Sequence, residues 1–575
     1  AQLQTKLHYF MVDEYQDTNT VQEAIVLLLA GKNNNLCVVG DDDQALYRFR
    51  GATVRNILEF PQRLTGCTRI ELIDNYRSQP DIVEFYDRRM SGHEWRHDGV
   101  EMRHAKKLNA VRPAASAAPQ VIKVTAEPGD WEAEVLAFLK TLHATGKVSD
   151  WNQVAFLFRS VRNDRVLALA RKLEAANIPV YSPRSNLFFE RDEVRLMVGA
   201  MIVLFPQFGE VVKADWKGEP PPLFEWYEGC QKALVDAAKD SGHADMRRWL
   251  GFRRKDHVSL AGNTDYAFSG LFYELLSFPL FAAFLTDARS LGGVRDSRAA
   301  HNLATLSRLL TRFESWRHIK VLSPEFIESN LRNLFSNYLR FLYEGGIDEF
   351  EDEADYAPTG CVAFMTVHQA KGLQFPVTIV GLPATGPRKG HTELDEILQR
   401  DHYLKPALEP LERTKDYDFW RLYYTAFSRA QDLLVLTTPE KLEGSGRKIP
   451  CAEFHDVCTN VPAWRKYKRG LAALELSKPS KADLKSQYSF TSHVAVFENC
   501  ARQYQFFKEL AFTPVRSTAI LFGTLVHQTI EDIHKATLRG ESALVTETQV
   551  GSWFDDNYRH LSKRERSYLS ATSLK

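Results

Sequence analysis

The fold of this chain is constrained most by two apolar runs that each end in a cluster of acidic and amide side chains. Residues 11–19 read Met-Val-Asp-Glu-Tyr-Gln-Asp-Thr-Asn, and residues 39–52 read Val-Gly-Asp-Asp-Asp-Gln-Ala-Leu-Tyr-Arg-Phe-Arg-Gly-Ala. A buried parallel strand delivers polar groups to the carboxyl edge of an α/β sheet in this way, and ligands bind at that edge. The sequence therefore predicts a parallel sheet with a ligand site after these two strands.

The side chains at this edge suit phosphoryl chemistry. Asp13 and Glu14 could hold Mg²⁺ and activate a water, and Gln44 could orient that water or a terminal phosphate. For an isolated Asp-Glu pair, however, a salt-bridged strand end is the commoner interpretation. The sequence contains no Gly-x-x-x-x-Gly-Lys-Ser/Thr loop to cradle phosphates. We therefore expect the part of an ATP site that binds the metal ion and activates water, without the loop that binds the phosphates.

Composition narrows the class of protein. A chain of 575 residues is expected to form several domains. It contains no apolar run of the ~20 residues that span a bilayer, and its seven cysteines are too scattered for a disulfide framework. We expect a cytoplasmic protein with no membrane contact. Lys+Arg and Asp+Glu both number 73, so net charge neither supports nor excludes nucleic acid.

The apolar pattern divides the chain into sheet and helical regions. Strands and helices alternate up to residue 205, with strands expected at Ile70–Ile73 and Val154–Phe158. Residues 206–355 contain amphipathic helical stretches at His301–Trp316 and Pro324–Tyr343. The sheet pattern resumes at Cys361–Val367. This order predicts an α/β protein with a mostly helical insertion.

Five phrases, in order, resemble the second to sixth helicase motifs of the UvrD/Rep/PcrA family of superfamily 1. They are Val12-Asp13-Glu14-Tyr15-Gln16-Asp17, the segment Gly40–Ala52, Asn75-Tyr76-Arg77-Ser78, Thr366-Val367-His368-Gln369-Ala370-Lys371-Gly372-Leu373-Gln374-Phe375-Pro376, and Arg421-Leu422-Tyr423-Tyr424-Thr425-Ala426-Phe427-Ser428-Arg429-Ala430. Any one phrase would be a modest signal, but five in order over roughly 430 residues are a strong one.

The resemblance implies ATP and Mg²⁺ as cofactors and gives the candidate residues roles. Asp13 serves the metal, Glu14 is the general base, and Gln44 links the nucleotide to the DNA-binding loop. Arg77 and Arg429 contact the γ-phosphate, as planar guanidinium groups can.

The resemblance also implies contacts with the rest of the nucleotide. Tyr76 stacks on adenine, although core packing is the alternative. Gly372 and Gln374 are assigned to nucleotide binding as well, and Gln374 stands where the family commonly has a ribose-binding Glu. An amide can still hydrogen-bond a hydroxyl.

A second set is implied to bind DNA. Aromatic rings interleaved with arginines suit single-stranded DNA, because every base offers a stacking face and every nucleotide a phosphate. The candidates are Tyr47, Phe49, Arg50, Thr366 and His368. The family more often has Trp at the Phe49 position, and one of the two rings could instead be buried. For an isolated His, a core position is the commoner interpretation.

The last segment carries a separate resemblance. Phe522-Gly523-Thr524-Leu525-Val526-His527-Gln528-Thr529-Ile530-Glu531 is similar to the opening of the RecB/AddB-type PD-(D/E)XK nuclease domain. This similarity makes His527 a candidate metal ligand, with Glu531 one helical turn away. On spacing alone, a polar stripe on an amphipathic helix is the commoner interpretation. The Asp and the Glu-x-Lys pair of such a nuclease are expected to follow Lys575.

We expect six segments. They are the C-terminal part of a first, incomplete RecA-like lobe (1–69), two parts of a second RecA-like lobe (70–205 and 356–440), the helical insertion (206–355), a connector (441–486), and the truncated start of an α+β nuclease-like domain (487–575).

The sequence thus predicts a fragment of an ATP-dependent 3′-to-5′ DNA helicase, a single-stranded DNA translocase, fused to a nuclease and acting in DNA repair or recombination. Its partners would be single-stranded and duplex DNA. Without a phosphate-binding loop, residues 1–575 are expected to be inactive in ATP hydrolysis. Two alternatives stay open: an ATPase-inactive protein that binds single-stranded DNA, and one chain of a split helicase.

Overall fold

The structure, a computed structural model, divides the chain into two compact units. It describes residue 4 and residues 9–31, 35–64, 66–114, 119–182, 187–213, 222–285, 288–289, 295–345, 360–389, 391–402, 409–441, 446, 449–478, 489–514 and 518–565. Unit 1 comprises Ala1–Ser182, Arg289–Asp296 and Glu351–Leu484, and unit 2 comprises Pro183–Ala288, Ser297–Phe350 and Lys485–Lys575. The predicted boundaries at 355/356 and 486/487 lie outside the described residues.

A six-stranded parallel sheet forms the centre of unit 1. Its spatial order is β7-β14-β13-β8-β12-β9, and every neighbouring pair is parallel. All five residues of β8 are buried, as expected for a strand covered on both faces. The sheet confirms the predicted α/β class. Its strands are β7 (Val121–Ala126), β8 (Val154–Phe158), β9 (Val180–Tyr181), β12 (Val362–Thr366), β13 (Phe375–Gly381) and β14 (Ala430–Pro439).

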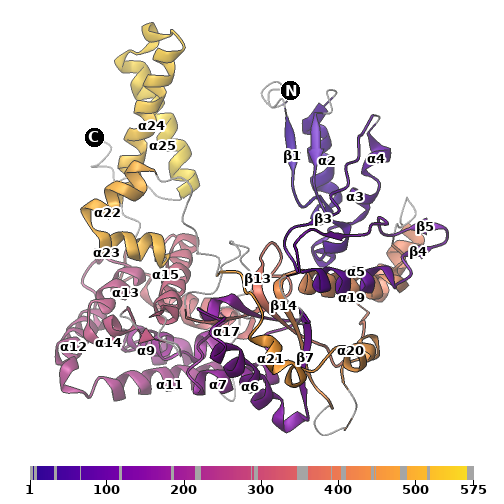
Figure 1. Ribbon diagram of the computed structural model, residues 1–575. Helices are drawn as coiled ribbons and strands as arrows, with labels where there is room; N and C mark the ends of the chain where they lie inside the picture. Colours follow the sequence, from indigo (N-terminus) through magenta and orange to yellow (C-terminus); the bar gives the residue numbers. More distant parts are fainter. Residues whose placement is uncertain are drawn as a thin grey trace. The chain divides into compact units, whose positions relative to one another are not determined.

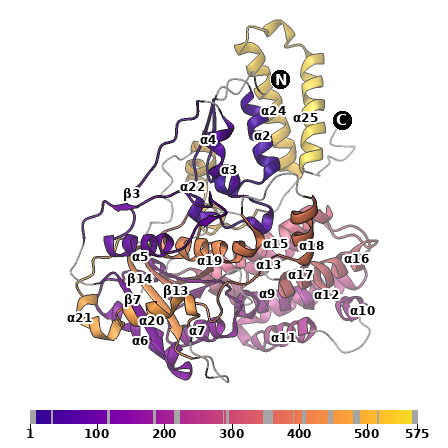
Figure 2. The same ribbon diagram turned by 90° about the vertical axis from the view of Figure 1, so that its right-hand side faces the viewer.

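Helices cover both faces of this sheet (Figures 1 and 2). Helices α5 (Pro80–Ser91) and α19 (Leu411–Phe427) lie side by side on one face. They pack edge to face through the ring pairs Phe85–Phe427 and Tyr86–Tyr424. Helices α6 (Trp131–Ala144) and α7 (Asp164–Ala175) lie on the other face. The arrangement buries the strands and leaves their carboxyl edge to carry the loops.

Strands β1 (Phe10–Val12) and β2 (Leu36–Val38) form a separate parallel pair in unit 1, with Val12 opposite Val38. Helix α2 (Thr20–Ala30) follows β1 and begins with a reciprocal capping box between Asn19 and Gln22. Both predicted strands therefore exist and end together, which brings their polar continuations to one place.

One predicted strand of unit 1 is wrong. Ile70–Ile73 is irregular, with Ile70 79% and Leu72 82% exposed. Pairing begins only at the carbonyl of Ile73, which accepts from the Asn109 amide at 2.9 Å. The apolar run therefore lacks the neighbouring strand that would bury it. The paired strand is β3 (Asp74–Asn75), which runs parallel to β6 (Asn109–Ala110).

The remaining elements of unit 1 are short, and one of them, β10, begins at the last residue of a unit 2 segment. They are η1 (Tyr15–Asp17), η3 (Asp42–Gln44), η4 (Arg48–Arg50), α3 (Arg55–Leu58), α4 (Phe60–Arg63), β4 (Arg96–His97), β5 (Val100–Glu101), η5 (Pro128–Asp130), η6 (Trp151–Gln153), β10 (Ala288–Arg289), β11 (Arg295–Asp296), α18 (Glu393–Ile397), the π-helical η10 (Leu398–His402), η11 (Ala452–Phe454), α20 (His455–Asn460), η12 (Trp464–Tyr467) and α21 (Lys468–Leu471).

Unit 2 is helical in its described residues. Helix α9 (Asp192–Val203) crosses α11 (Pro222–Ala237) so closely that a Cβ on Gly199 would lie 2.3 Å from the Cys230 carbonyl oxygen. Sequence analysis assigned this stretch to the second RecA-like lobe (70–205), because it directly follows the region in which strands and helices alternate. In the structure α9 packs in the helical core.

The predicted helical stretches of the insertion are present in unit 2. His301–Trp316 lies within α15 (Arg298–Arg317), and Pro324–Tyr343 contains α16 (Ile327–Leu331), the π-helical η9 (Arg332–Leu339) and the start of α17 (Arg340–Gly345). The other helices of this part are α8 (Leu187–Glu190), α10 (Phe208–Lys213), η7 (Ser241–His243), α12 (Ala244–Val258), α13 (Phe268–Leu276), α14 (Pro279–Ala282) and η8 (Ala283–Leu285).

The C-terminal part of unit 2 is also helical where it is described. Helices α24 (Thr518–Leu538) and α25 (Glu547–Glu565) pack around Leu525 and Leu561. No strand is present in residues 489–514 and 518–565, so the predicted α+β nuclease character stays a prediction. The shorter elements are η13 (Phe490–Val494), α22 (Ala495–Asn499), α23 (Ala501–Tyr504), η14 (Gln505–Glu509) and η15 (Ser542–Leu544).

Within the described ranges, no single helix is both long and apolar enough to cross a membrane. The bent pair Phe268–Leu276 and Pro279–Leu285 meets the criterion by length and composition when taken together. Phe268, Leu271 and Phe272 are fully buried in the core of unit 2. The apolar side chains of this helix therefore pack inside the protein.

Glu314 on α15 makes the stability of unit 2 depend on pH. It accepts hydrogen bonds from the Ser269 amide and hydroxyl, both at 2.7 Å. Burial raises its pKa to about 7, against the opposing effect of these bonds. Between the unfolded value of 4.5 and about 7, the folded chain binds the extra proton, so stability falls as pH rises through this window. Above pH 7, Glu314 is ionised in both the folded and the unfolded chain, and the full free-energy cost of burying its charge lowers the stability of unit 2.

We therefore expect Glu314→Gln to be more stable than the unsubstituted chain at pH 8, by up to about 3 kcal/mol, and close to it at pH 5. Urea unfolding followed by tryptophan fluorescence at both pH values measures this difference. Glu328→Gln, at an exposed position of α16, is the control. An equal effect of Glu314→Gln at the two pH values would contradict the assignment.

Candidate functional site

The segment after β1 is joined to the segment after β2 through Gln16. Glu14 has a left-handed backbone, with φ 51°, and its amide donates to Asp13 Oδ1 at 2.8 Å. Gln16 Nε2 donates to Glu14 Oε2, while Gln16 Oε1 accepts from the Asp41 amide at 3.1 Å. A Cβ on Gly40 would lie 2.3 Å from this Oε1, so only glycine allows the approach. The predicted carboxylates and the second polar segment therefore lie together.

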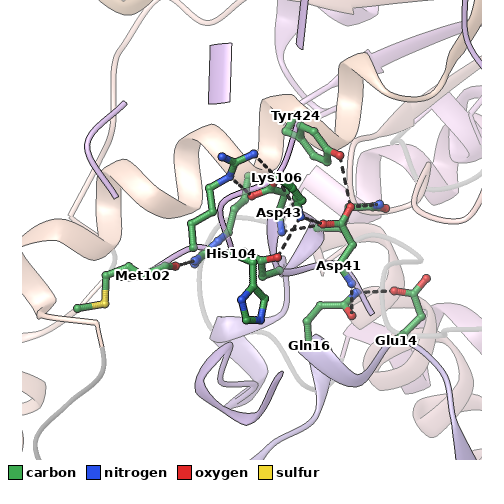
Figure 3. A network of polar contacts seen from close by, with 12 residues as sticks. Glu14, Gln16, Asp41, Asp43, Met102, His104, Lys106 and Tyr424 are labelled. Carbon is green, nitrogen blue, oxygen red and sulfur yellow. Dashed lines mark hydrogen bonds and ion pairs between the residues drawn. The ribbon is translucent and has the colours of Figure 1, made fainter. Parts of the chain in front are cut away.

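Three consecutive carboxylates, Asp41, Asp42 and Asp43, are held by residues 102–106 (Figure 3). Arg103 donates to both oxygens of Asp43, at 2.7 and 2.8 Å. Lys106 Nζ contacts Asp41, Asp42 at 3.0 Å and Asp43 at 3.1 Å. Burial alone would lower the pKa of Lys106, but the carboxylates more than reverse this effect and raise it. The ammonium therefore stays charged and fixes the acidic segment.

Gln44 connects this acidic segment to α19 and the turn after it. Its Nε2 donates to Asp41 Oδ2 at 2.7 Å, and its Oε1 accepts from Arg429 Nη2 at 3.1 Å. The Tyr424 hydroxyl also donates to Asp41 Oδ2, at 3.4 Å (Figure 3). The amide that sequence analysis assigned to coupling is thus oriented from both sides.

Two arginines predicted to contact a terminal phosphate belong to this site. Arg429 is 1% exposed. Burial, and then the nearby charge of Arg77, lower its pKa to about 10, so it remains a cation at neutral pH. Arg77 Nε donates to Gln374 Oε1 at 3.0 Å, which pairs a predicted phosphate contact with a predicted ribose contact. The two guanidinium groups repel each other, and an anion bound beside both would reduce this repulsion.

The surroundings of Tyr76 and Gly372 can be described, while their predicted contacts with a nucleotide stay predictions. Tyr76 is 71% exposed, which excludes the core-packing alternative for this ring. Gly372 has φ 80° in the turn between β12 and β13, a backbone conformation that favours glycine. Gln374 follows in the same turn, directly before β13.

The predicted DNA contacts form an aromatic cluster, which we define as Tyr47, Phe49 and His368. Phe49 packs edge to face on His368 at 5.6 Å between ring centres, and Tyr47 lies 6.0 Å from Phe49. The Arg50 guanidinium lies 5.3 Å from the centre of the Tyr47 ring and 5.4 Å from that of Phe49. Phe49 is 69% exposed, so much of this ring is accessible from outside the protein.

The two predicted contacts from the β12 turn differ in their surroundings. The Thr366 hydroxyl accepts from the Gln369 amide at 3.3 Å and so helps to shape the turn. Burial lowers the pKa of His368, and the nearby cations Arg50 and Lys371 lower it further. The imidazole is therefore neutral at neutral pH.

Sequence analysis missed Arg48 and Lys371. Arg48 stands between Tyr47 and Phe49 in sequence but donates to Asp418 on α19, at 2.9 and 3.1 Å, and pairs with Glu409, which lies just before that helix. Its partners lie more than 360 residues away, so no local signal could reveal them. Lys371 lies within the fifth motif, next to residues that were assigned, and that proximity was the available signal.

His527 and Glu531 lie one turn apart on α24, as predicted, but the described partner of Glu531 is Lys535 at 2.8 Å. Across the part of the chain that the structure describes, no group of three His, Cys, Asp or Glu side chains is arranged to hold a metal ion. The metal-binding role of His527 stays a prediction.

Known DNA helicases are similar to this chain in sequence. The family described as UvrD/REP helicase N-terminal domain matches residues 1–65. The ATP-dependent DNA helicase PcrA of Staphylococcus epidermidis is 24% identical over 456 residues, covering 76% of this chain and 55% of the relative. PcrA of Staphylococcus aureus is 24% identical over 458 residues, with the same two coverages.

The chain is a homologue of the PcrA/UvrD-type DNA helicases. It spans about half the length of the curated relatives it matches. The family match at residues 1–65 contains Asp13, Glu14 and Gln44.

Proposed function

We propose that this chain forms part of an ATP-dependent DNA helicase that moves 3′-to-5′ along single-stranded DNA and acts in DNA repair or recombination. The observation that carries the proposal is the double contact of Gln44. The side-chain amide of Gln44 contacts Asp41, the first of the three consecutive carboxylates. It also contacts Arg429, which lies close enough to Arg77 to feel its charge. This double contact links candidate catalytic residues from two distant parts of the sequence, and homology to PcrA supports a role of these residues with DNA.

The residues present fit a magnesium nucleotide. Mg²⁺ is usually held by one or two carboxylates together with substrate phosphates, rather than by a complete protein cage. Asp13 is exposed directly after the end of β1, where its carboxylate is accessible to a metal ion. When bound, the metal ion would neutralise developing phosphate charge. Asp13 would be its ligand.

The chain's own side chains would then divide the work of hydrolysis. Glu14 accepts a proton from the attacking water, and Gln44 orients the reacting groups. Arg77 and Arg429 stabilise the charge on the equatorial oxygens of the transferred phosphoryl group. Tyr76 stacks on the base, and Gly372 and Gln374 border the ribose.

The aromatic cluster would hold the DNA strand. Bases stack on Phe49 and on the adjacent rings, while Arg50 attracts the phosphates. Thr366 and His368 contribute from the β12 turn. Because a neutral His368 adds no charge, most of the salt dependence of binding would come from the arginines.

Phe49→Ala is expected to weaken binding of single-stranded DNA by about 5- to 150-fold, which corresponds to the loss of one stacked base. Fluorescence anisotropy with labelled oligo(dT) at fixed salt measures this affinity, and needs no ATP hydrolysis. Phe252→Ala removes a ring that is 62% exposed on α12 of unit 2 and is the matched control. Equal losses for the two variants would show that Phe49 is no specific stacking site.

The function is tested by ATP hydrolysis of the natural gene product with and without oligo(dT), and by unwinding of partial duplexes. We expect DNA to stimulate hydrolysis, and only substrates with a 3′ single-stranded tail to be unwound. Residues 1–575 contain no phosphate-binding loop motif, so this part alone is expected to hydrolyse ATP negligibly. Tight DNA binding without hydrolysis by the gene product would favour the ATPase-inactive alternative. Hydrolysis that appears only on mixing with a second chain would favour a split helicase.

The nuclease is a separate proposal, supported by the resemblance of residues 522–531 and by the spacing of His527 and Glu531 on α24. It predicts Mg²⁺-dependent cleavage of DNA by the gene product, lost in His527→Ala. Cleavage that persists in this variant, or none in the unsubstituted protein, would contradict it.

A further inference from the structure

Lys371 is a buried cation in the turn that also carries the predicted DNA and nucleotide contacts. The turn joins β12 to β13, and the Lys371 side chain is only 7% exposed. Thr366 and His368 precede it, and Gly372 and Gln374 follow it. Its position in the chain is therefore between the two groups of assigned residues.

The ammonium group of Lys371 contacts the catalytic carboxylate. Nζ lies 3.3 Å from Glu14 Oε2, donates to the Gln44 carbonyl oxygen at 2.9 Å, and pairs with Asp17. Three N–H donors thus find three oxygen acceptors. Glu14 Oε2 also accepts from Gln16, so both contacts fall on the same carboxylate oxygen. While Lys371 remains there, it competes with water or a cation for that oxygen.

The same ammonium group contacts the aromatic cluster. Nζ lies 5.3 Å from the centre of the Tyr47 ring, within the range of a cation–π interaction. Tyr47 lies 6.0 Å from Phe49 and 6.2 Å from His368. One atom therefore touches both the general base and a ring of the predicted stacking surface.

We propose that Lys371 is a positioning residue that couples occupancy of the aromatic cluster by single-stranded DNA to the availability of Glu14. A base stacked on the cluster shifts Tyr47 and its contact with the ammonium. The ammonium then shifts relative to Glu14, because it cannot keep both contacts unchanged. The inference rests on the proposed function and names the side chain through which DNA stimulates hydrolysis.

Three variants of the natural gene product separate coupling from folding and binding. Lys371→Met keeps the apolar stem and removes the charge, whereas Lys371→Arg keeps the charge. Lys389→Met removes an exposed lysine of the same unit, which pairs with Glu396. Each variant is measured for its melting temperature, its affinity for labelled oligo(dT), and its rate of ATP hydrolysis with and without saturating oligo(dT).

In Lys371→Met we expect the ratio of the two hydrolysis rates to fall by about tenfold, the size of a typical coupling between sites. Affinity for oligo(dT) is expected to change far less. Lys371→Arg should restore much of the ratio, and Lys389→Met should keep it. Equal loss of both rates, with the ratio preserved, would overturn the proposal, as would loss of the ratio through loss of DNA affinity alone. Absence of DNA stimulation in the unsubstituted protein would instead refute the proposed function.

Discussion

Replacing Arg429 with lysine is expected to lower DNA-stimulated ATP hydrolysis by about 10³-fold or more, in the range seen when an arginine finger is removed. The guanidinium is fixed by four hydrogen bonds, to the carbonyls of Thr425 (3.0 Å) and Leu373 (3.2 Å), to Gln44 Oε1 (3.1 Å) and to Ser428 Oγ (2.9 Å). A lysine has three donors at one point and cannot reproduce this planar array. Gln44 would lose its hydrogen-bond partner, and the transition state would lose the planar guanidinium contact, although a positive charge remains.

The measurement is kcat and kcat/KM for ATP at saturating oligo(dT), with the melting temperature as a check on folding. Arg400→Lys is the control, because Arg400 is 70% exposed and pairs only with its neighbour Asp401 among its described ion pairs. We expect the control to keep its activity. If Arg429→Lys folds and retains activity within about threefold of the control, Arg429 is no arginine finger.

The parts of the site that sequence analysis predicted are those with a local cause. Asp13 and Glu14 follow directly on β1, and Gln44 lies in the polar segment that begins after β2. The end of an apolar run marks these residues without any knowledge of packing. Strand β8 has the predicted bounds, since a fully buried strand is a continuous apolar run. Phe49 and Arg50 were selected as candidates from the alternation of ring and charge along the sequence, and their contact with DNA stays a prediction.

What was missed depends on contacts between residues far apart in sequence. Arg103 and Lys106 hold Asp41–Asp43 only because their segment packs against these carboxylates, some 60 residues earlier in the sequence. Lys371 reaches Asp17 across 354 positions. The exposed irregular run Ile70–Ile73 shows the converse, because β propensity without a neighbouring strand makes no strand.

Replacing Glu14 with glutamine is expected to lower kcat by about 10²- to 10⁴-fold, the usual contribution of a general base. Glu14 adopts φ 51°, which costs a non-glycine residue about 1–2 kcal/mol. Backbone strain of this kind persists where the surroundings hold it, and it clusters at active sites. Here the Asp13 carboxylate and Gln16 hold the residue, and its side chain remains 49% exposed at the end of β1.

Glutamine preserves the size of the side chain and an oxygen that can accept from Gln16, but it cannot take a proton from water. Affinity for oligo(dT) should therefore stay near that of the unsubstituted protein while turnover is lost, which separates a chemical role from a structural one. Glu71→Gln alters an exposed carboxylate that pairs with Arg69 in the same unit and should leave kcat unchanged. Turnover within about threefold of this control would remove Glu14 from the mechanism. The strained backbone would then have to be explained by its hydrogen bonds alone, and Lys371 would be coupled to a carboxylate without a catalytic role.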